Sequence, residues 1–297
     1  MEIVVFGAGS IGSLLGGLLA RVPAHEVTLV GREAHVEAIR RDGLRISGIE
    51  EFTVRPTATT DGTGLSADLA LVTVKAFDTE AAASELRTGD FRAVCSLQNG
   101  MGNEEALAAQ LDCAVLGGTT SYGAVRERPG AVAWNGAGDL VVGPWEPRDC
   151  DDVAGEVAAA FREAGIDAER VDADGIRERL WEKLAVNAAI NPTTALARVE
   201  NGALAAPPAS ALIEPIAREV AATARAVGVD LGDAAAIDAV EAVVDATAEN
   251  ESSMCRDVRQ GRRTEIDVIN GYVVERAREV GIEVPTNRTL WTLIRAW

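Results

Sequence analysis

Ile3-Val4-Val5-Phe6 leads directly into Gly7-Ala8-Gly9-Ser10-Ile11-Gly12, and small and apolar residues at helical spacing follow to Ala20. A GxGxxG motif alone is weak evidence, but here it stands between a strand and a helix, as dinucleotide binding requires. Gly7 would make the tight turn, Gly9 would let the backbone approach a pyrophosphate, and Gly12 would allow close helix–strand packing. The helix N-terminus would offer N–H groups to the anion. We therefore expect a dinucleotide to contact Gly7, Ala8, Gly9, Ser10, Ile11 and Gly12; the alternative is a glycine turn with a structural role only.

The second strand bears on which dinucleotide binds. In an NAD site an acidic residue ending this strand binds the ribose 2′-hydroxyl. Here Val27–Val30 is followed by Gly31 and Arg32, and an arginine can pair with a 2′-phosphate as a bidentate donor. The sequence favours NADP, although Glu33 could serve NAD and Arg32 could be an ordinary surface arginine.

Outward from this motif, strand-like and helix-like segments alternate through the first half of the chain. Runs that are apolar at every position are typical of parallel strands covered on both faces. Alternating strands and helices predict an α/β, Rossmann-like doubly wound sheet. A hairpin of Ala131–Trp134 and Leu140–Val142 is expected to extend it. The further expected elements are strands at Leu69–Val74, Ala93–Leu97, Ala114–Leu116 and Ile166–Val171, and a helix at Val153–Ala164.

Beyond about Asp172 the strand signals stop and apolar residues recur at helical spacing, interrupted by Pro and Gly. This pattern predicts an all-α second domain, so that residues 1–172 form the NADP-binding domain and residues 173–297 the helical substrate domain. The expected helices are Asp174–Ala189, Ser210–Val227, Asp233–Glu249, Thr264–Val280 and Arg288–Ala296.

Charge and composition exclude several function classes. The 297 residues carry 46 acidic and 28 basic side chains, a net charge of −18, which disfavours a nucleic-acid or anionic-membrane partner. No apolar run reaches the ~18 residues of a membrane helix, and no signal peptide is recognisable, so a cytoplasmic location is expected. The four Cys and two His show no metal-ligand spacing, so no metal is expected.

Lysine is nearly absent, since only Lys75 and Lys183 occur among the 28 basic residues. Codon bias toward Arg is one explanation. A salty cytoplasm, in which an acidic surface keeps proteins dissolved, is the favoured one. In either case lysine stays where arginine would not serve, because only lysine can lose its proton at working pH.

A second group of polar residues lies in Trp181–Pro192. Lys183, Asn187 and Asn191 follow one another at i, i+4 and i+8, which places them on one helix face. An amine and two amides on an otherwise apolar helix favour a ligand site; the alternative is an amide ladder that caps backbone groups. Asn191 before Pro192 also fits a helix end.

A third cluster follows at Thr247–Met254 and Arg262–Asp267. Asn250 and Ser253 are expected to share a helix face. Thr264-x-x-Asp267 resembles a capping box at a helix start, which leaves Glu265 unexplained.

Taken together, these residues resemble the ketopantoate reductase (2-dehydropantoate 2-reductase) family over nearly the whole chain. The resemblance rests on motifs in the family's order: Gly7–Gly12, Val72-Thr-Val-Lys75, Gln98-Asn99-Gly100-Met101-Gly102, Trp181–Pro192, Asp245–Met254 and Thr264–Gly271.

The resemblance implies a role for each matching residue. Lys183 would be the general acid. The substrate's carboxylate and hydroxyl would be held by Asn187, Asn191, Asn201, Asn250 and Ser253. Glu265 would lie at the cofactor–substrate junction and Arg32 at the 2′-phosphate, while Lys75, Asn99 and Ala124 would line the nicotinamide side. The stretch before Ala124 and the charge of Glu251 depart from the family pattern.

The implied activity is the NADPH-dependent reduction of ketopantoate to pantoate, a step toward pantothenate and coenzyme A. Two alternatives stay open: a reductase of another small 2-keto acid, and a module that senses NADPH without turnover. The sequence does not decide whether the chain forms a homodimer.

Overall fold

The structure is a computed structural model that describes residues 1–145 and 150–297. By its contacts the chain divides into two compact units. The first contains Met1–Gln98 and Asn103–Ile176, and the second contains Asn99–Gly102 and Arg177–Trp297. The short Asn99–Gly102 segment thus groups with the second unit although it directly follows the first in sequence.

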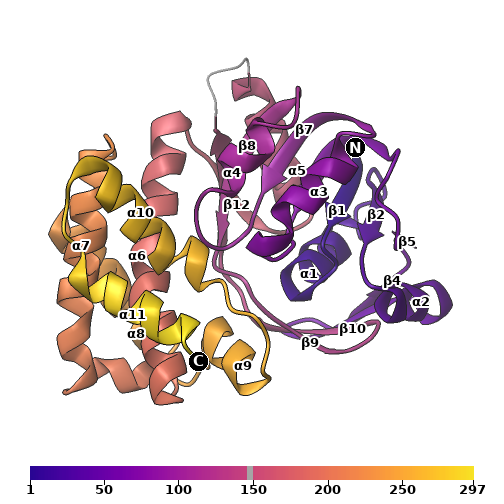
Figure 1. Cartoon of the computed structure of the whole chain (residues 1–297). Helices are drawn as coiled ribbons and strands as arrows, with labels where there is room; N and C mark the ends of the chain where they lie inside the picture. The colour runs from indigo at the N-terminus through magenta and orange to yellow at the C-terminus, as the bar shows by residue number, and fades with distance from the viewer. Residues whose placement is uncertain (146–149) are drawn as a thin grey trace. The chain divides into compact units, whose positions relative to one another are not determined.

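The first unit is built on an eight-stranded sheet (Figure 1). Its strands are β1 (Glu2–Phe6), β2 (Glu26–Val30), β5 (Thr57–Thr59), β6 (Ser66–Val72), β7 (Asp90–Ser96), β8 (Ala114–Thr120), β11 (Asp139–Pro144) and β12 (Asp167–Arg170). Their order is β12-β11-β8-β7-β6-β1-β2-β5. The run from β5 to β8 is parallel, β11 is antiparallel to β8, and β12 is parallel to β11. This confirms the expected α/β doubly wound sheet.

Both faces of the central strands are buried, as their uninterrupted apolar sequences predict. Alternate residues of β1, such as Ile3 and Val5, belong to one core cluster, and the intervening Val4 and Phe6 are buried as well. The helices of this unit are α1 (Ser10–Leu19), α2 (Glu33–Asp42), α3 (Thr79–Leu86), α4 (Asn103–Ala108) and α5 (Asp151–Glu163), with a 3-10 turn η1 (Ala76–Asp78). Leucines of α1 pack in the same cluster as Val157 and Phe161 of α5.

The expected hairpin of Ala131–Trp134 and Leu140–Val142 is wrong, because the two strands belong to different sheets. The second sheet has the order β4-β3-β10-β9. Its strands are β3 (Leu44–Gly48), β4 (Phe52–Val54), β9 (Gly123–Arg128) and β10 (Ala131–Gly136). β10 pairs antiparallel with β9 and parallel with β3, whereas β11 joins the main sheet. The tight turn at Gly130, with φ of 75°, forms the actual hairpin.

β8 is longer than the expected strand Ala114–Leu116, since it continues through two glycines to Thr120. A Cβ on Gly118 would lie 2.6 Å from Leu97 Cδ2. Glycine here reflects the close packing of β8 and does not end the strand.

The second unit is helical, as expected. Its helices are α6 (Ala173–Ala197), α7 (Ile213–Ala226), α8 (Asp233–Ala246), α9 (Ser253–Arg259), α10 (Asn270–Val280) and α11 (Pro285–Arg295), with 3-10 turns η2 (Asn201–Ala205), η3 (Ala209–Leu212) and η4 (Ile266–Val268). α6 begins in the last residues of the first unit and carries the Lys183, Asn187 and Asn191 series.

Two helix boundaries differ from the sequence expectations. Asn191 does not end its helix, because α6 continues through Pro192 to Ala197. The helix expected from Thr264 begins only at Asn270, after η4, so the capping box is wrong. Asp267 instead accepts a hydrogen bond from the Trp291 indole at 2.9 Å and faces Arg295 at 3.5 Å.

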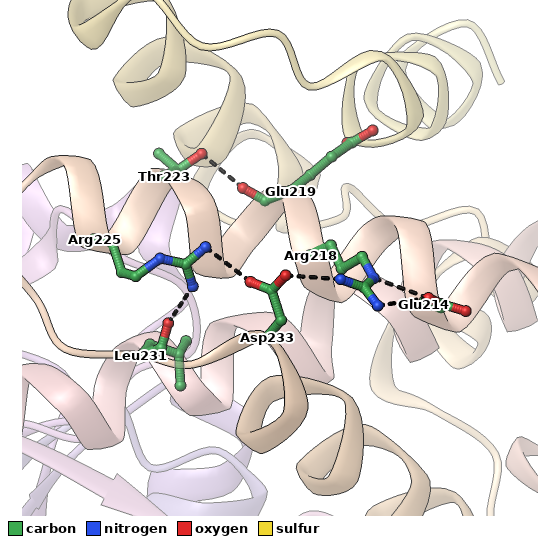
Figure 2. Close-up of polar contacts among 7 residues, drawn as sticks. All are labelled: Glu214, Arg218, Glu219, Thr223, Arg225, Leu231 and Asp233. Carbon is green, nitrogen blue, oxygen red and sulfur yellow. Dashed lines mark hydrogen bonds and ion pairs between the residues drawn. The ribbon is translucent and has the colours of Figure 1, made fainter.

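An ion-pair network joins α7 to the start of α8 (Figure 2). The Asp233 carboxylate, in the first turn of α8, lies 2.8 Å from both Arg218 and Arg225 of α7. Arg218 also pairs with Glu214, and Arg225 donates to the Leu231 carbonyl at 2.6 Å. Asp233 thus links the start of α8 to two positions that lie seven residues apart on α7.

Within the described part of the chain, no helix is both long and apolar enough to span a membrane.

Candidate active site

Four loops that carry expected cofactor residues begin at the carboxyl ends of neighbouring strands of the main sheet. Phe6 is in register with Val30 and with Val72, and Val72 is in register with Ser96. The carboxyl ends of these adjacent parallel strands therefore form a single edge. The glycine loop, Arg32, Lys75 and Asn99 all follow this edge, which is where open α/β sheets bind ligands.

The glycine loop has the geometry that the motif predicts. Gly7 has φ of 105°, and a Cβ there would lie 2.6 Å from the Val74 backbone nitrogen. A Cβ on Gly12 would collide with the Gly7 carbonyl oxygen and Thr73 Oγ1. Both glycines are thus required by the folded chain itself.

Gly9 differs, because among the described residues a Cβ there would meet only the Gly7 oxygen, at 3.8 Å. Gly9 leaves room beside the start of α1 that a side chain would occupy. This is the cradle that a pyrophosphate needs, so the loop fits a dinucleotide.

The start of α1 also fits an anion. The helical hydrogen bonds begin with Ser13 N donating to the Gly9 oxygen at 3.1 Å. The N–H groups of Ser10, Ile11 and Gly12 precede this bond and have no acceptor within the helix. Ser10 Oγ accepts from the Arg126 backbone N–H of β9 at 3.0 Å, which fixes the first turn against the second sheet.

Arg32 is exposed at the N-cap of α2. Among the described residues its side chain makes no hydrogen bond or ion pair. The preceding Gly31 is needed for packing, because a Cβ there would lie 2.9 Å from Ala8 Cβ. The end of β2 can therefore approach the glycine loop closely. The Arg32 guanidinium follows directly in sequence and makes no side-chain hydrogen bond or ion pair with the described residues.

His35 supports this region, a role that no motif in the sequence indicates. Its ring is buried, Nδ1 accepts from the Gly130 N–H at 3.0 Å, and Nε2 lies 3.0 Å from Ser13 Oγ. Since Nδ1 is the acceptor, Nε2 carries the proton and donates to Ser13. The neutral ring thus joins α2 to α1 and to the β9–β10 turn.

Burial and, secondarily, the charge of Arg126 lower the pKa of His35 from 6.5 to about 4. The His35 side chain of the unfolded chain therefore takes up a proton near pH 6.5, whereas in the folded protein it does so only near pH 4. The stability that the neutral His35 ring contributes is fully present above pH 6.5 and is lost as the pH falls. We expect the free energy of unfolding to drop by about 2 kcal/mol between pH 7 and pH 5 from this group. Denaturant titrations at both pH values measure the drop, and His35→Gln should reduce it by that amount; equal drops in both proteins would contradict the assignment.

Gln98 is a residue whose role the sequence did not assign, although it directly precedes Asn99. It is buried, and its Nε2 donates to the Val74 carbonyl at 3.2 Å and to Thr79 Oγ1 at 2.7 Å. Val74 directly precedes Lys75. The Gln98 amide therefore ties the backbone before Lys75 to the residue before Asn99. The signal in the sequence was a polar residue shortly after a buried strand.

Asn99 and Glu265 occupy neighbouring segments of the second unit. Met101 N donates to the Val268 carbonyl at 2.9 Å, and a Cβ on Gly100 would lie 2.5 Å from Val268 Cγ2. Glu265 is buried directly before η4, which contains Val268. Ala124 lies half-buried in β9 of the first unit, opposite Trp134.

On α6, Lys183 and Asn187 are half-buried and Asn191 is buried, while the intervening Leu184 and Ala188 are fully covered. The three polar residues share a face, as the spacing predicts.

The remaining substrate candidates converge on one connection. Asn201 N donates to the Asn250 carbonyl, and Asn201 Nδ2 donates to Thr247 Oγ1, both at 2.9 Å. Asn201 Oδ1 is buried with no hydrogen-bond partner among the described residues. A buried acceptor left unpaired is costly, so this atom is suited to a ligand hydroxyl.

Asn250 and Ser253 do not share a helix face, contrary to expectation. Asn250 is exposed in the turn after α8, and Ser253 begins α9. Ser252 provides the N-cap that ends the connection, with its Oγ accepting from Cys255 N. The same Oγ lies 2.7 Å from Thr194 Oγ1 of α6, which brings Ser253 near the polar helix.

Comparison with known proteins identifies the family. Residues 3–147 match the family model described as Ketopantoate reductase PanE/ApbA, and residues 175–297 match Ketopantoate reductase PanE/ApbA C terminal. A 2-dehydropantoate 2-reductase from Archaeoglobus fulgidus is 42% identical, over 99% of this chain and 97% of the relative.

Solved structures are also similar over the full chain. A PanE/ApbA family ketopantoate reductase from Ralstonia eutropha has a TM-score of 0.90 and 35% identity, covering 100% of this chain and 98% of that one. A D-mandelate dehydrogenase solved with NADH and anilino(oxo)acetate has a TM-score of 0.92 and 25% identity, covering 100% and 97%. Two family models that together span most of the chain, and full-length relatives above 40% identity, establish that this protein belongs to the ketopantoate reductase family.

Proposed function

We propose that this protein reduces 2-dehydropantoate (ketopantoate) to pantoate with NADPH, a step toward pantothenate and coenzyme A. The observation that carries the proposal is the full-length similarity to relatives named 2-dehydropantoate 2-reductase, with Lys183 and its two asparagines on one face of α6.

NADPH is the proposed cofactor, and the residues present fit it. The pyrophosphate would bind at the start of α1, where Gly9 leaves room, and Arg32 would pair with the 2′-phosphate. Lys75, Asn99 and Ala124 would line the nicotinamide side, and Glu265 would lie at the junction with the substrate. When bound, NADPH supplies the hydride that reduces the C2 carbonyl carbon.

Lys183 is the proposed proton donor. As the carbonyl is reduced, negative charge develops on its oxygen, and the ammonium Nζ can stabilise that charge and transfer its proton. Its half-buried place on a rigid helix limits the positions that the amine can reach.

The asparagines have a complementary role. Asn187, Asn191 and Asn201, with Asn250 and Ser253, would hold the substrate's carboxylate and hydroxyl through neutral donors and acceptors. Neutral side chains bind a carboxylate without placing a second negative charge beside it, which matters in a chain of net charge −18.

A second candidate is the reduction of another 2-keto acid. The close fold similarity to D-mandelate dehydrogenase supports keeping it, since that protein was solved with NADH and an oxoacetate. The exposed, unengaged Arg32 favours NADPH over NADH for this chain.

The test is oxidation of NADPH by the purified protein, followed at 340 nm (roughly the absorption maximum of a reduced nicotinamide), with and without ketopantoate. A panel of 2-keto acids and both cofactors should give the highest kcat/KM for ketopantoate with NADPH. A higher kcat/KM for another 2-keto acid would favour the second candidate. NADPH binding without any substrate-dependent oxidation would indicate a sensing module instead.

A further inference from the structure

Pro192 leaves one backbone acceptor of α6 without its helical donor. In an α-helix the N–H of residue 192 would bond to the carbonyl of residue 188, and proline has no N–H. α6 nevertheless continues through this point to Ala197. Ala188 is fully buried, so its carbonyl needs a donor from elsewhere in the protein.

Asn270 supplies that donor. Its Nδ2 lies 3.1 Å from the Ala188 carbonyl oxygen and also donates to Asn287 Oδ1 at 2.9 Å. Both asparagines are 0% exposed. Because Nδ2 faces two acceptors, the amide cannot be turned over, and Asn270 Oδ1 is left without a hydrogen-bond partner among the described residues. Asn270 Oδ1 thus stays unpaired, while Asn270 Nδ2 donates to the Ala188 carbonyl oxygen.

Asn287 is itself held firmly. Its side-chain Nδ2 and its backbone N–H both donate to Glu219 Oε2 at 2.8 Å, and Thr286 N donates to the other carboxylate oxygen at 2.9 Å. Glu219 thereby binds the first-turn N–H groups of α11, where a negative charge is favourable. Within α7, Thr223 Oγ1 donates to the Glu219 backbone carbonyl at 2.8 Å (Figure 2).

These bonds form a chain of buried and part-buried contacts from α7 through the starts of α11 and α10 to α6. The chain ends on Ala188, whose neighbour is Asn187, while Pro192 follows Asn191 directly. The contact therefore lies between the two asparagines proposed to bind substrate. A helix containing proline bends or shifts where its hydrogen bond is missing, unless another group takes over.

We propose that Asn270 is a positioning residue for substrate binding: by replacing the N–H that Pro192 lacks, it sets the directions of Asn187 and Asn191. The inference rests on the proposed function of these two asparagines. It also makes a structural claim that is measurable without turnover.

The test is Asn270→Leu, which keeps the side-chain volume and removes the donor. Because uniform substrate binding is lost, we expect the KM for ketopantoate to rise on the order of tenfold, with kcat and the KM for NADPH changed less than about twofold. Val273→Ala is the matched control, since it creates a small cavity in the same helix and keeps the Asn270 amide that bonds to Ala188. It should lower the melting temperature and leave the KM for ketopantoate unchanged.

Rescue separates positioning from general damage. Pro192→Ala gives residue 192 an N–H that can bond to Ala188, so Asn270→Leu/Pro192→Ala should recover a KM within about threefold of wild type. An unchanged KM in Asn270→Leu, an equal rise for both substrates, or no rescue would each overturn the proposal. If Asn270→Leu does not fold, Asn270→Ser and its double variant with Pro192→Ala replace it.

Hydrogen–deuterium exchange gives a readout that is independent of the reaction. Amides of residues 187–195 should exchange faster in Asn270→Leu and return toward wild-type rates in the double variant. If the wild type reduces no 2-keto acid, the proposed function fails, while exchange still decides whether Asn270 fixes this part of α6. Unchanged exchange in Asn270→Leu would refute the positioning role whatever the activity.

Discussion

Lys183→Ala is expected to lower kcat for ketopantoate reduction by ~10²–10⁴-fold, the usual contribution of a general acid. The fold and NADPH binding should persist, since alanine suits a helix interior and the proposed NADPH contacts of the glycine loop and Arg32 lie elsewhere. The proton is needed only as the hydride arrives, so the loss belongs mainly to kcat. Steady-state kinetics on the folded variant measure it.

Two comparisons sharpen this result. Lys183→Arg should restore little, because a guanidinium retains its proton at working pH. Glu182→Gln, a half-exposed neighbour on α6, should keep wild-type kcat. In the wild type kcat/KM should decline on the alkaline side, and Lys183→Ala should lack that decline. Retention of more than about a third of wild-type kcat by Lys183→Ala would exclude Lys183 as the donor and favour Glu265 or water.

The second large effect is expected from Arg32→Ala. This variant should lose about 1.5–3 kcal/mol of NADPH binding free energy, seen mainly as a higher KM for NADPH, while the KM for NADH stays nearly unchanged. Arg32 is exposed and makes no side-chain hydrogen bond or ion pair within the described residues, so its removal breaks nothing in the folded protein. The change should therefore be confined to the cofactor that carries a 2′-phosphate.

Arg41→Ala is the matched control, an exposed arginine on the same helix whose partner is Asp42. It should leave the KM for both cofactors unchanged. Equal losses for NADPH and NADH in Arg32→Ala would mean that Arg32 does not recognise the phosphate.

The sequence by itself determined the features that depend on near neighbours in the chain. Apolar runs predicted central strands buried on both faces. The glycine loop predicted the turn into α1, because Gly7 adopts a positive φ and a Cβ on Gly12 would collide with the nearby Gly7 carbonyl oxygen. The i, i+4, i+8 series placed Lys183, Asn187 and Asn191 on one face, since helical periodicity needs no tertiary information.

The tertiary structure decided what depends on partners far apart in sequence. β10 does not form the expected hairpin, because it pairs with β3 and β9 in the second sheet. His35 Nδ1 accepts a hydrogen bond from the Gly130 backbone N–H, 95 residues away. Pro192 after Asn191 fits a helix end, yet α6 continues past it, and Asn270, 82 residues from Ala188, donates to the carbonyl that lacks its helical donor. A proline removes one hydrogen bond locally, but whether the helix stops depends on whether the fold brings another donor to the freed carbonyl.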